Sequence, residues 1–163
     1  MATNNVTPLD PVARHRSEEL RRKVFAGTLS KLTTEDWDAM MSRAETRLYR
    51  YNEVILRQDV VGEALFIVAD GEVRVEREGT NRSAQLARLG PGSVFGEMSL
   101  LDQAGASASV IADGKVEVVC LDSEGLIGLV RGDAGFAARF FQSLATTLSR
   151  RLRATNELIL GRF

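Results

Sequence analysis

Alternating apolar and polar residues dominate the middle of the chain. Between residues 45 and 122, short runs rich in β-branched and aromatic residues are separated by turns that contain glycine. Two of these turns are the Asp-Gly pairs Asp70-Gly71 and Asp113-Gly114, and each is typical of a β-hairpin. The pattern predicts an antiparallel β-roll of about eight strands, similar to a jelly roll.

Helical periodicity lies on both sides of this β region. Residues 13–44 predict N-terminal helices, in which Trp37 is spaced with two methionines to form an apolar face suited to the core. Residues 123–163 predict a short helix followed by a long one, and residues 1–12 are polar and are expected to form a flexible tail. The expected fold class is therefore mainly β with flanking helices (α+β).

Apolar residues spaced three and four apart form two stripes on the long predicted helix. One stripe, suited to packing on the roll, contains Phe136, Phe140 and Leu144. The other stripe contains Ala138, Phe141, Ala145, Leu148, Leu152, Thr155 and Ile159. The second stripe favours a parallel homodimer, and one broad face that covers the helix's own domain is the alternative. The neighbouring arginines Arg150, Arg151 and Arg153 are expected on a solvated face.

Charge and composition exclude several classes of function. Residues 51–130 hold 6 basic and 13 acidic side chains, a net charge of −7, so an anionic ligand there needs local donors. The single histidine, His15, excludes a multi-histidine metal site, and we expect neither a resident cofactor nor an enzyme. Apolar runs are shorter than the roughly 18 residues of a membrane span, so we expect a cytoplasmic protein without membrane contact.

A short motif interrupts the roll between the sixth and seventh predicted strands. It begins with Phe95-Gly96-Glu97, continues through Met98-Ser99-Leu100-Leu101, and ends in a loop of alanine, glycine and serine. A short helix that begins beside a glycine leaves backbone N–H groups unpaired and pointing in one direction, which attracts anions and phosphate above all. From these residues alone, an ordinary loop and helix is the alternative interpretation.

The motif resembles the phosphate-binding cassette of cyclic-nucleotide-binding domains, and the order of predicted elements is similar to sensor domains of the catabolite-activator (Crp-Fnr) type. In that family the cassette glutamate binds the ribose 2′-OH, and a cassette arginine with backbone N–H groups binds the cyclic phosphate. The resemblance places a cassette at residues 95–109. It implies that the ligand-binding residues there are Phe95, Gly96, Glu97, Met98, Ser99, Leu100, Ala106, Ser107 and Ala108.

The long helix carries a second resemblance. Residues 150–157 resemble the segment of catabolite-activator-type members whose threonine and serine contact the adenine base. Thr155 and Asn156 stand at these two positions, and asparagine can donate and accept hydrogen bonds as serine does. The resemblance therefore implies that Thr155 and Asn156 bind the base when the helix closes over the ligand.

One cassette position departs from the family. Ala106 stands where these domains carry the arginine. A charge-assisted hydrogen bond contributes about 1.5–3 kcal/mol, so its loss weakens binding by about ten- to a hundredfold or more. Arg82 and Arg88, on or beside the fifth predicted strand, are the candidates to replace it.

Three hypotheses therefore stay open. The first is a stand-alone sensor that binds cAMP or cGMP and signals through its long helix to a protein partner. The second is a degenerate domain of the same fold that binds no nucleotide and acts as a dimeric interaction module. The third is a different ligand, such as a dinucleotide messenger or a small metabolite. No helix-turn-helix region fits in the chain, so we expect no direct binding to DNA.

Overall fold

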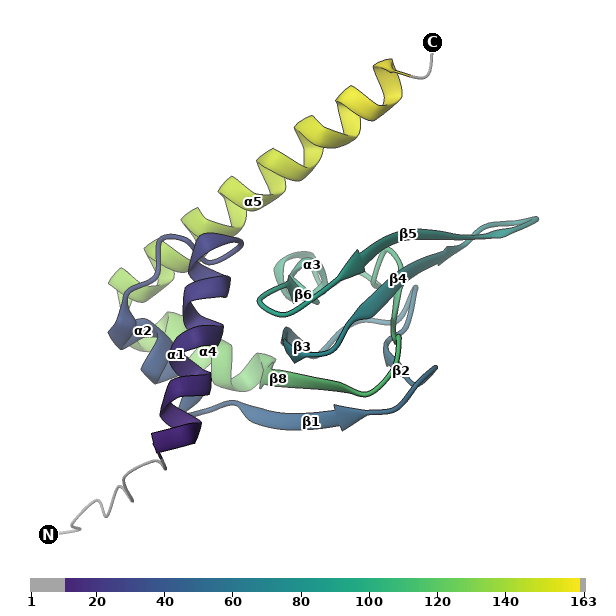
Figure 1. Ribbon diagram of the computed structural model, residues 1–163. Helices are drawn as coiled ribbons and strands as arrows, with labels where there is room; N and C mark the ends of the chain where they lie inside the picture. The colour runs from purple at the N-terminus through teal and green to yellow at the C-terminus, as the bar shows by residue number, and fades with distance from the viewer. Residues whose placement is uncertain (1–10, 162–163) are drawn as a thin grey trace, which may run out of the picture.

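The computed structural model of the chain describes residues 11–161 and contains two antiparallel four-stranded sheets (Figure 1). The strand order is β1-β8-β3-β6 in one sheet and β2-β7-β4-β5 in the other. The strands are Glu45–Tyr49 (β1), Val54–Leu56 (β2), Ala64–Asp70 (β3), Val73–Glu78 (β4), Ser83–Leu89 (β5), Val94–Phe95 (β6), Ser109–Ala112 (β7) and Val116–Asp122 (β8). The prediction of an antiparallel β-roll with flanking helices is confirmed.

The two Asp-Gly turns join strands of different sheets, so the prediction that each closes a hairpin is wrong. β3 and β8 belong to one sheet, whereas β4 and β7 belong to the other. Gly71 has a φ of +80°, and a Cβ atom there would lie 2.4 Å from the carbonyl oxygen of Lys115. The two corners of the roll therefore pack against each other, and only glycine fits at Gly71. β4 and β5 do form a hairpin, in which Glu78 lies opposite Ser83.

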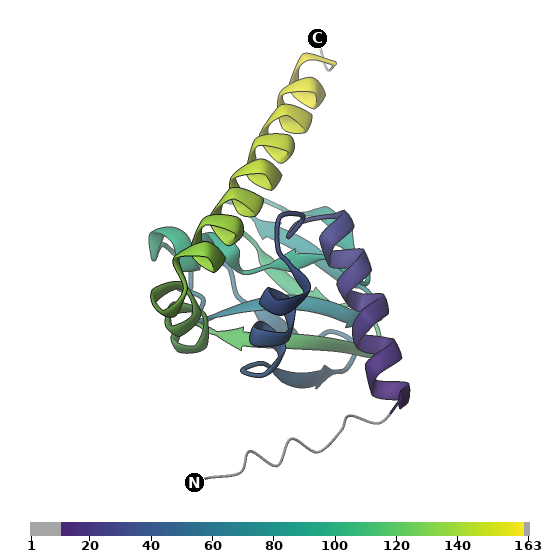
Figure 2. The ribbon, with the colours of Figure 1, turned by 90° about the vertical axis from the view of Figure 1, so that its left-hand side faces the viewer.

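The helices of the described chain gather mainly at one end of the roll. They are Pro11–Ala26 (α1), Thr34–Met41 (α2), Glu97–Asp102 (α3), Ser123–Gly132 (α4) and Ala134–Leu160 (α5). α3 lies between β6 and β7 in the chain, and the C-terminal part of α5 extends away from the rest of the chain (Figures 1 and 2). Residues 1–10 of the predicted tail lie outside the described residues, and Pro11 already belongs to α1.

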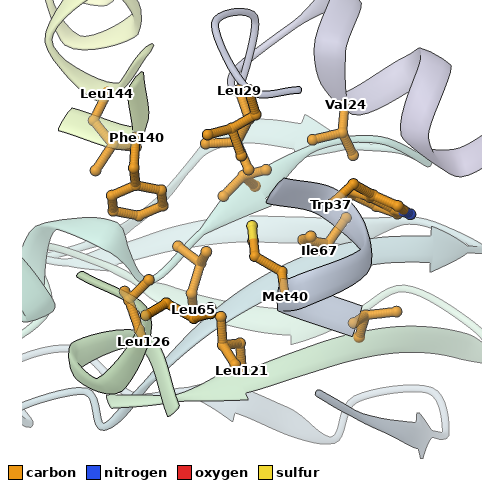
Figure 3. Close-up of a cluster of buried hydrophobic side chains, with 14 of the residues drawn as sticks. Val24, Leu29, Trp37, Met40, Leu65, Ile67, Leu121, Leu126, Phe140 and Leu144 are labelled. Carbon is orange, nitrogen blue, oxygen red and sulfur yellow. The ribbon is translucent and has the colours of Figure 1, made fainter. Parts of the chain in front are cut away.

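A large apolar cluster joins the helices to the β1-β8-β3-β6 sheet (Figure 3). Trp37 and Met40 of α2 and Phe140 of α5 pack there with Leu65 and Ile67 of β3. Trp37 is 1% exposed, which confirms its predicted place in the core. This cluster fixes the position of the helices relative to the strand that precedes the cassette.

A second apolar cluster fills the space between the two sheets. Phe66 and Val68 of β3 contribute to it, together with Val73, Val110 and Cys120. Because neighbouring residues of a strand point to opposite faces, β3 is buried on both sides. Burial in this cluster raises the pKa of the Cys120 thiol, as expected for a cysteine that packs as a small apolar side chain.

The two predicted stripes of α5 have different surroundings. Phe136, Phe140 and Leu144 are each 2% exposed and pack in the helix cluster, so their predicted packing on the roll is confirmed. In the second stripe, Leu152 is 63% exposed and Ile159 is 53% exposed. The second stripe is therefore not covered by the described residues of its own chain.

Polar contacts also hold the N-terminal half of α5. Arg139 donates two hydrogen bonds to the buried carboxylate of Asp36 on α2, at 2.7 and 2.8 Å. Further along, Thr147 and Arg150 donate to the carbonyl oxygens of residues 27–28 in the α1–α2 loop, at 3.1 and 2.9 Å. These contacts hold α5 against the N-terminal helices.

Candidate functional site

A glycine in the left-handed region starts the cassette. β6 ends at Phe95, and Gly96 then adopts a φ of +85° before α3 begins. A Cβ atom at Gly96 would lie 2.6 Å from the carbonyl oxygen of Ala64, so a side chain is excluded here by both strain and contact. Phe95 is buried and stacks on Phe66 of β3, with 5.0 Å between the ring centroids. The aromatic residue therefore anchors the cassette in the roll.

α3 presents its residues to three different environments. The side chains of Glu97 and Ser99 are buried, Leu100 is half-buried against the helix cluster, and Met98 is 45% exposed. No described side chain makes a capping hydrogen bond at the N-terminus of α3. The helix thus combines a buried carboxylate with backbone donors that lack a side-chain cap.

The buried carboxylate of Glu97 pairs with a cation from α5. The Nη1 atom of Arg151 donates to Oε1 of Glu97 at 2.6 Å, and its Nη2 atom donates to the carbonyl oxygen of Val94 at 3.4 Å. Glu97 is 4% exposed, and a buried charge is stabilised by such a partner. Arg151 is exposed, as predicted for this face of the helix, but the sequence did not predict that its guanidinium reaches the cassette.

The end of the cassette is held by the loop that precedes β3. The N–H of Ala106 donates to the carbonyl oxygen of Val60, and the N–H of Asp59 donates to that of Ala106, both at 2.9 Å. Ala106 and Ala108 are buried, whereas Ser107 between them is exposed. The cassette therefore keeps a defined backbone although residue 106 is not an arginine.

Three arginines of the β4–β5 hairpin, Arg77, Arg82 and Arg88, differ in their contacts. Arg88, one of the two predicted substitutes, pairs with Asp113 at 2.8 Å, and Arg82 lies in the β4–β5 turn. Arg77 of β4, which the sequence did not single out, donates from Nη1 to the carbonyl oxygen of Ser107 at 3.2 Å. The guanidinium that contacts the end of the cassette therefore comes from Arg77.

Thr155 and Asn156 lie on the exposed C-terminal part of α5. The hydroxyl of Thr155 donates to the carbonyl oxygen of Arg151 in its own helix at 3.0 Å. Within residues 11–161, neither side chain makes a hydrogen bond to the cassette. The structure therefore places both residues one turn beyond Arg151, and their contact with a base remains a prediction.

An apolar cavity of about 460 Å³ lies between the cassette and the helices that follow the roll. Glu97, Ser99 and Leu100 of α3 line one side, and Phe140 and Phe141 of α5 line another. Movement of α5 would change the walls of this cavity directly. The cavity therefore connects the position of the cassette helix to the position of α5.

No group of three or more histidine, cysteine, aspartate or glutamate side chains in residues 11–161 is arranged to hold a metal ion. No helix in that part of the chain has both the length and the apolar character that crossing a membrane requires.

Comparisons with known proteins identify the family. The model of the cyclic nucleotide-binding domain matches residues 46–133. The cyclic AMP receptor protein of Thermus thermophilus is 41% identical over 125 residues, which cover 75% of this chain and 55% of that protein. The crystal structure of Thermus thermophilus catabolite activator protein superposes with a TM-score of 0.71 and 38% identity, and the match covers 85% of this chain and 62% of the other.

A second solved structure supports the fold alone. A cyclic nucleotide-binding domain from Methylobacillus flagellatus has a TM-score of 0.81 at 24% identity, over 93% of this chain and 86% of the other. The chain spans 55%, 20% and 37% of the length of three curated relatives that it matches. Because the family model covers more than half of the 163 residues, the chain belongs to the cyclic nucleotide-binding domain family.

Proposed function

We propose that the chain is a regulatory module that binds a cyclic nucleotide, cAMP or cGMP, and transmits binding through α5 to a protein partner. Family membership supports the ligand class, and the printed name of the Thermus relative, a cyclic AMP receptor protein, favours cAMP. The module acts by binding rather than by catalysis. Its ligand lies in the roll against the cassette of residues 95–109.

The observation that carries this proposal is the ion pair between Glu97 and Arg151. Glu97 stands at the cassette position that binds the ribose 2′-OH in the family, and Arg151 lies on the helix that transmits the signal. A ribose hydroxyl that donates to Glu97 competes with Arg151 for the same carboxylate. Ligand binding therefore changes the contact that holds the C-terminal half of α5 to the cassette.

Once ligand binding has changed the contact between Arg151 and Glu97, α5 moves and completes the site. Thr155 lies one turn beyond Arg151 on α5, so a small movement of the helix brings Thr155 and Asn156 towards the mouth of the roll. The Ser107 hydroxyl and the N–H groups of α3 contact the phosphate, and Thr155 and Asn156 contact the base. The cavity behind the cassette provides the space in which Phe141 and Leu100 repack during this movement.

The exposed stripe of α5 supports self-association as part of the same function. Leu152 and Ile159 of this stripe are more than half exposed. The C-terminal part of α5 extends away from the roll (Figure 2). Two such helices packed side by side bury both stripes, as in a parallel coiled coil. The dimer then presents a surface to the partner that depends on the orientation of both helices.

A degenerate interaction module is the second candidate. Its support is the replacement of the cassette arginine by Ala106, together with the pairing of the Glu97 carboxylate with Arg151. In that case the ion pair fixes α5 permanently. Dimerisation through the exposed stripe would then be the main function.

Thermal shift with cAMP and cGMP separates the two candidates. For the sensor we expect a ligand-dependent rise in Tm for the wild type and a much smaller rise for Glu97→Gln, because the ribose loses its charged acceptor. Glu124→Gln, an exposed carboxylate on α4, is the matched control and should behave as the wild type does. No ligand-dependent shift in any of the three proteins at millimolar nucleotide would support the degenerate module.

A further inference from the structure

Arg77 lies near the exposed end of β4, beside the last residues of the cassette. Val73 and Val75 of β4 point into the cluster between the sheets, so Arg77, two residues further on, points to the same side at the open end of the strand. β4 pairs with β7 in regular register through Glu76 opposite Ser109. One further step in this register brings Arg77 next to Ala108.

Small residues of the cassette face this arginine. Ala106 and Ala108 carry only a methyl group, and the carbonyl oxygen of Ser107 between them accepts the hydrogen bond from Arg77 at 3.2 Å. The guanidinium reaches the segment where the family carries its arginine, from the opposite strand.

The charge of Arg77 is not neutralised within the described residues. Arg74, Arg88 and Arg151 each have a carboxylate within 4.0 Å, whereas no ion pair involves Arg77 in residues 11–161. Arg77 is exposed, and its contact with Ser107 uses one of the five guanidinium N–H donors. The remaining donors suit a phosphate, which accepts paired hydrogen bonds from guanidinium groups.

We propose that Arg77 is the residue that binds the cyclic phosphate of the ligand, in place of an arginine at position 106. This inference rests on the proposed function, because it assigns a donor to the same nucleotide site. The site then has two cations with separate tasks, since Arg151 neutralises Glu97 before the ligand binds and Arg77 neutralises the bound ligand. The assignment of Arg77 also explains how residues 51–130, which carry a net charge of −7, accept an anionic ligand.

The test is calorimetric titration of the full chain with the nucleotide that the wild type binds, using Arg77→Gln. We expect the Kd to rise by about ten- to a hundredfold, the loss expected for a charge-assisted hydrogen bond. The affinity of the wild type should also fall with added salt, and that of Arg77→Gln should fall less steeply. Arg22→Gln, an exposed arginine on α1, is the matched control, and Arg77→Lys should retain intermediate affinity.

The outcomes separate this inference from the proposed function. If the wild type binds cAMP or cGMP and Arg77→Gln binds equally well, Arg77 is not the phosphate donor and the sensor function stands. A weaker affinity with an unchanged salt dependence and a lower Tm indicates a structural role only, which also overturns the assignment. If the wild type binds neither nucleotide, the proposed function fails and this inference fails with it.

Discussion

The ion pair that joins α2 to α5 predicts a pH-dependent loss of stability. Asp36 is 4% exposed, and its carboxylate accepts two hydrogen bonds from Arg139 and one from the N–H of Thr33 at 2.9 Å. The hydrogen bonds from Arg139, the largest cause, hold the pKa of Asp36 below its ordinary value. We predict that Asp36→Asn, which keeps the shape and one acceptor, destabilises the protein at neutral pH.

The size of the destabilisation by Asp36→Asn follows from the hydrogen bonds that the variant loses. Hydrogen bonds to charged groups contribute about 1.5–3 kcal/mol each, and the retained amide oxygen preserves part of this pair. The side chain of Arg139 is 34% exposed, so water solvates its charge in the variant and limits the loss. We therefore expect a loss of about 2–4 kcal/mol, which lowers the Tm by roughly 5–15 °C in a chain of this size.

The sign of the pH dependence is fixed by the direction of the pKa shift. A carboxyl group whose pKa is lower in the folded state stabilises the fold fully above its unfolded pKa, about 3.9 for aspartate. This contribution is lost as the pH falls through the folded pKa of Asp36. The difference in Tm between wild type and Asp36→Asn should therefore be largest near neutral pH and should shrink below about pH 4.

Thermal denaturation followed by circular dichroism across this pH range measures the effect. Asp38→Asn is the matched control, because Asp38 lies exposed on the same helix. We expect its Tm to follow that of the wild type at every pH. A difference between wild type and Asp36→Asn that stays constant with pH, or that is absent at pH 7, would refute the role assigned to the pair with Arg139.

Three further predictions concern the cassette, α5 and the core. Gly96→Ala should lower the Tm and abolish nucleotide binding in a calorimetric titration, because the Cβ would lie 2.6 Å from a carbonyl oxygen at a φ of +85°. Leu152→Glu should halve the mass measured by sedimentation while leaving the Tm of the roll nearly unchanged; an unchanged mass would count against the α5 dimer. Cys120 should react with a thiol reagent only as the protein unfolds, since burial raises its pKa, and rapid reaction in native buffer would contradict this.

The fold was largely predictable because its signals are local. The alternation of apolar and polar residues over short runs identified the strands. The spacing of Phe136, Phe140 and Leu144 identified the packed face of α5. Asp70-Gly71 and Asp113-Gly114 were misinterpreted as hairpin turns, because a turn within one sheet and a corner between two sheets have the same local sequence. Which strands pair is decided by contacts between residues distant in the chain, which alternation does not encode.

The start of the cassette was predictable from the sequence, whereas the arginines that contact the cassette were not. Phe95-Gly96-Glu97 is a contiguous motif, and the structure shows why glycine is needed at its centre. Arg151 lies 54 residues from Glu97, and Arg77 lies 30 residues from Ser107, so neither contact has a local signal. A partial signal did exist, because Arg151 stands four residues before Thr155, a predicted ligand-binding residue, on the same helical face.

The most direct test of the central claim is calorimetric titration of the wild-type chain with cAMP and with cGMP. We predict saturable binding at micromolar concentration to one site per chain, since Arg77 supplies the cation that Ala106 does not. No heat of binding for either nucleotide at millimolar concentration, together with saturable binding by Ala106→Arg, would contradict it. That result would show an intact fold whose site has lost its ligand.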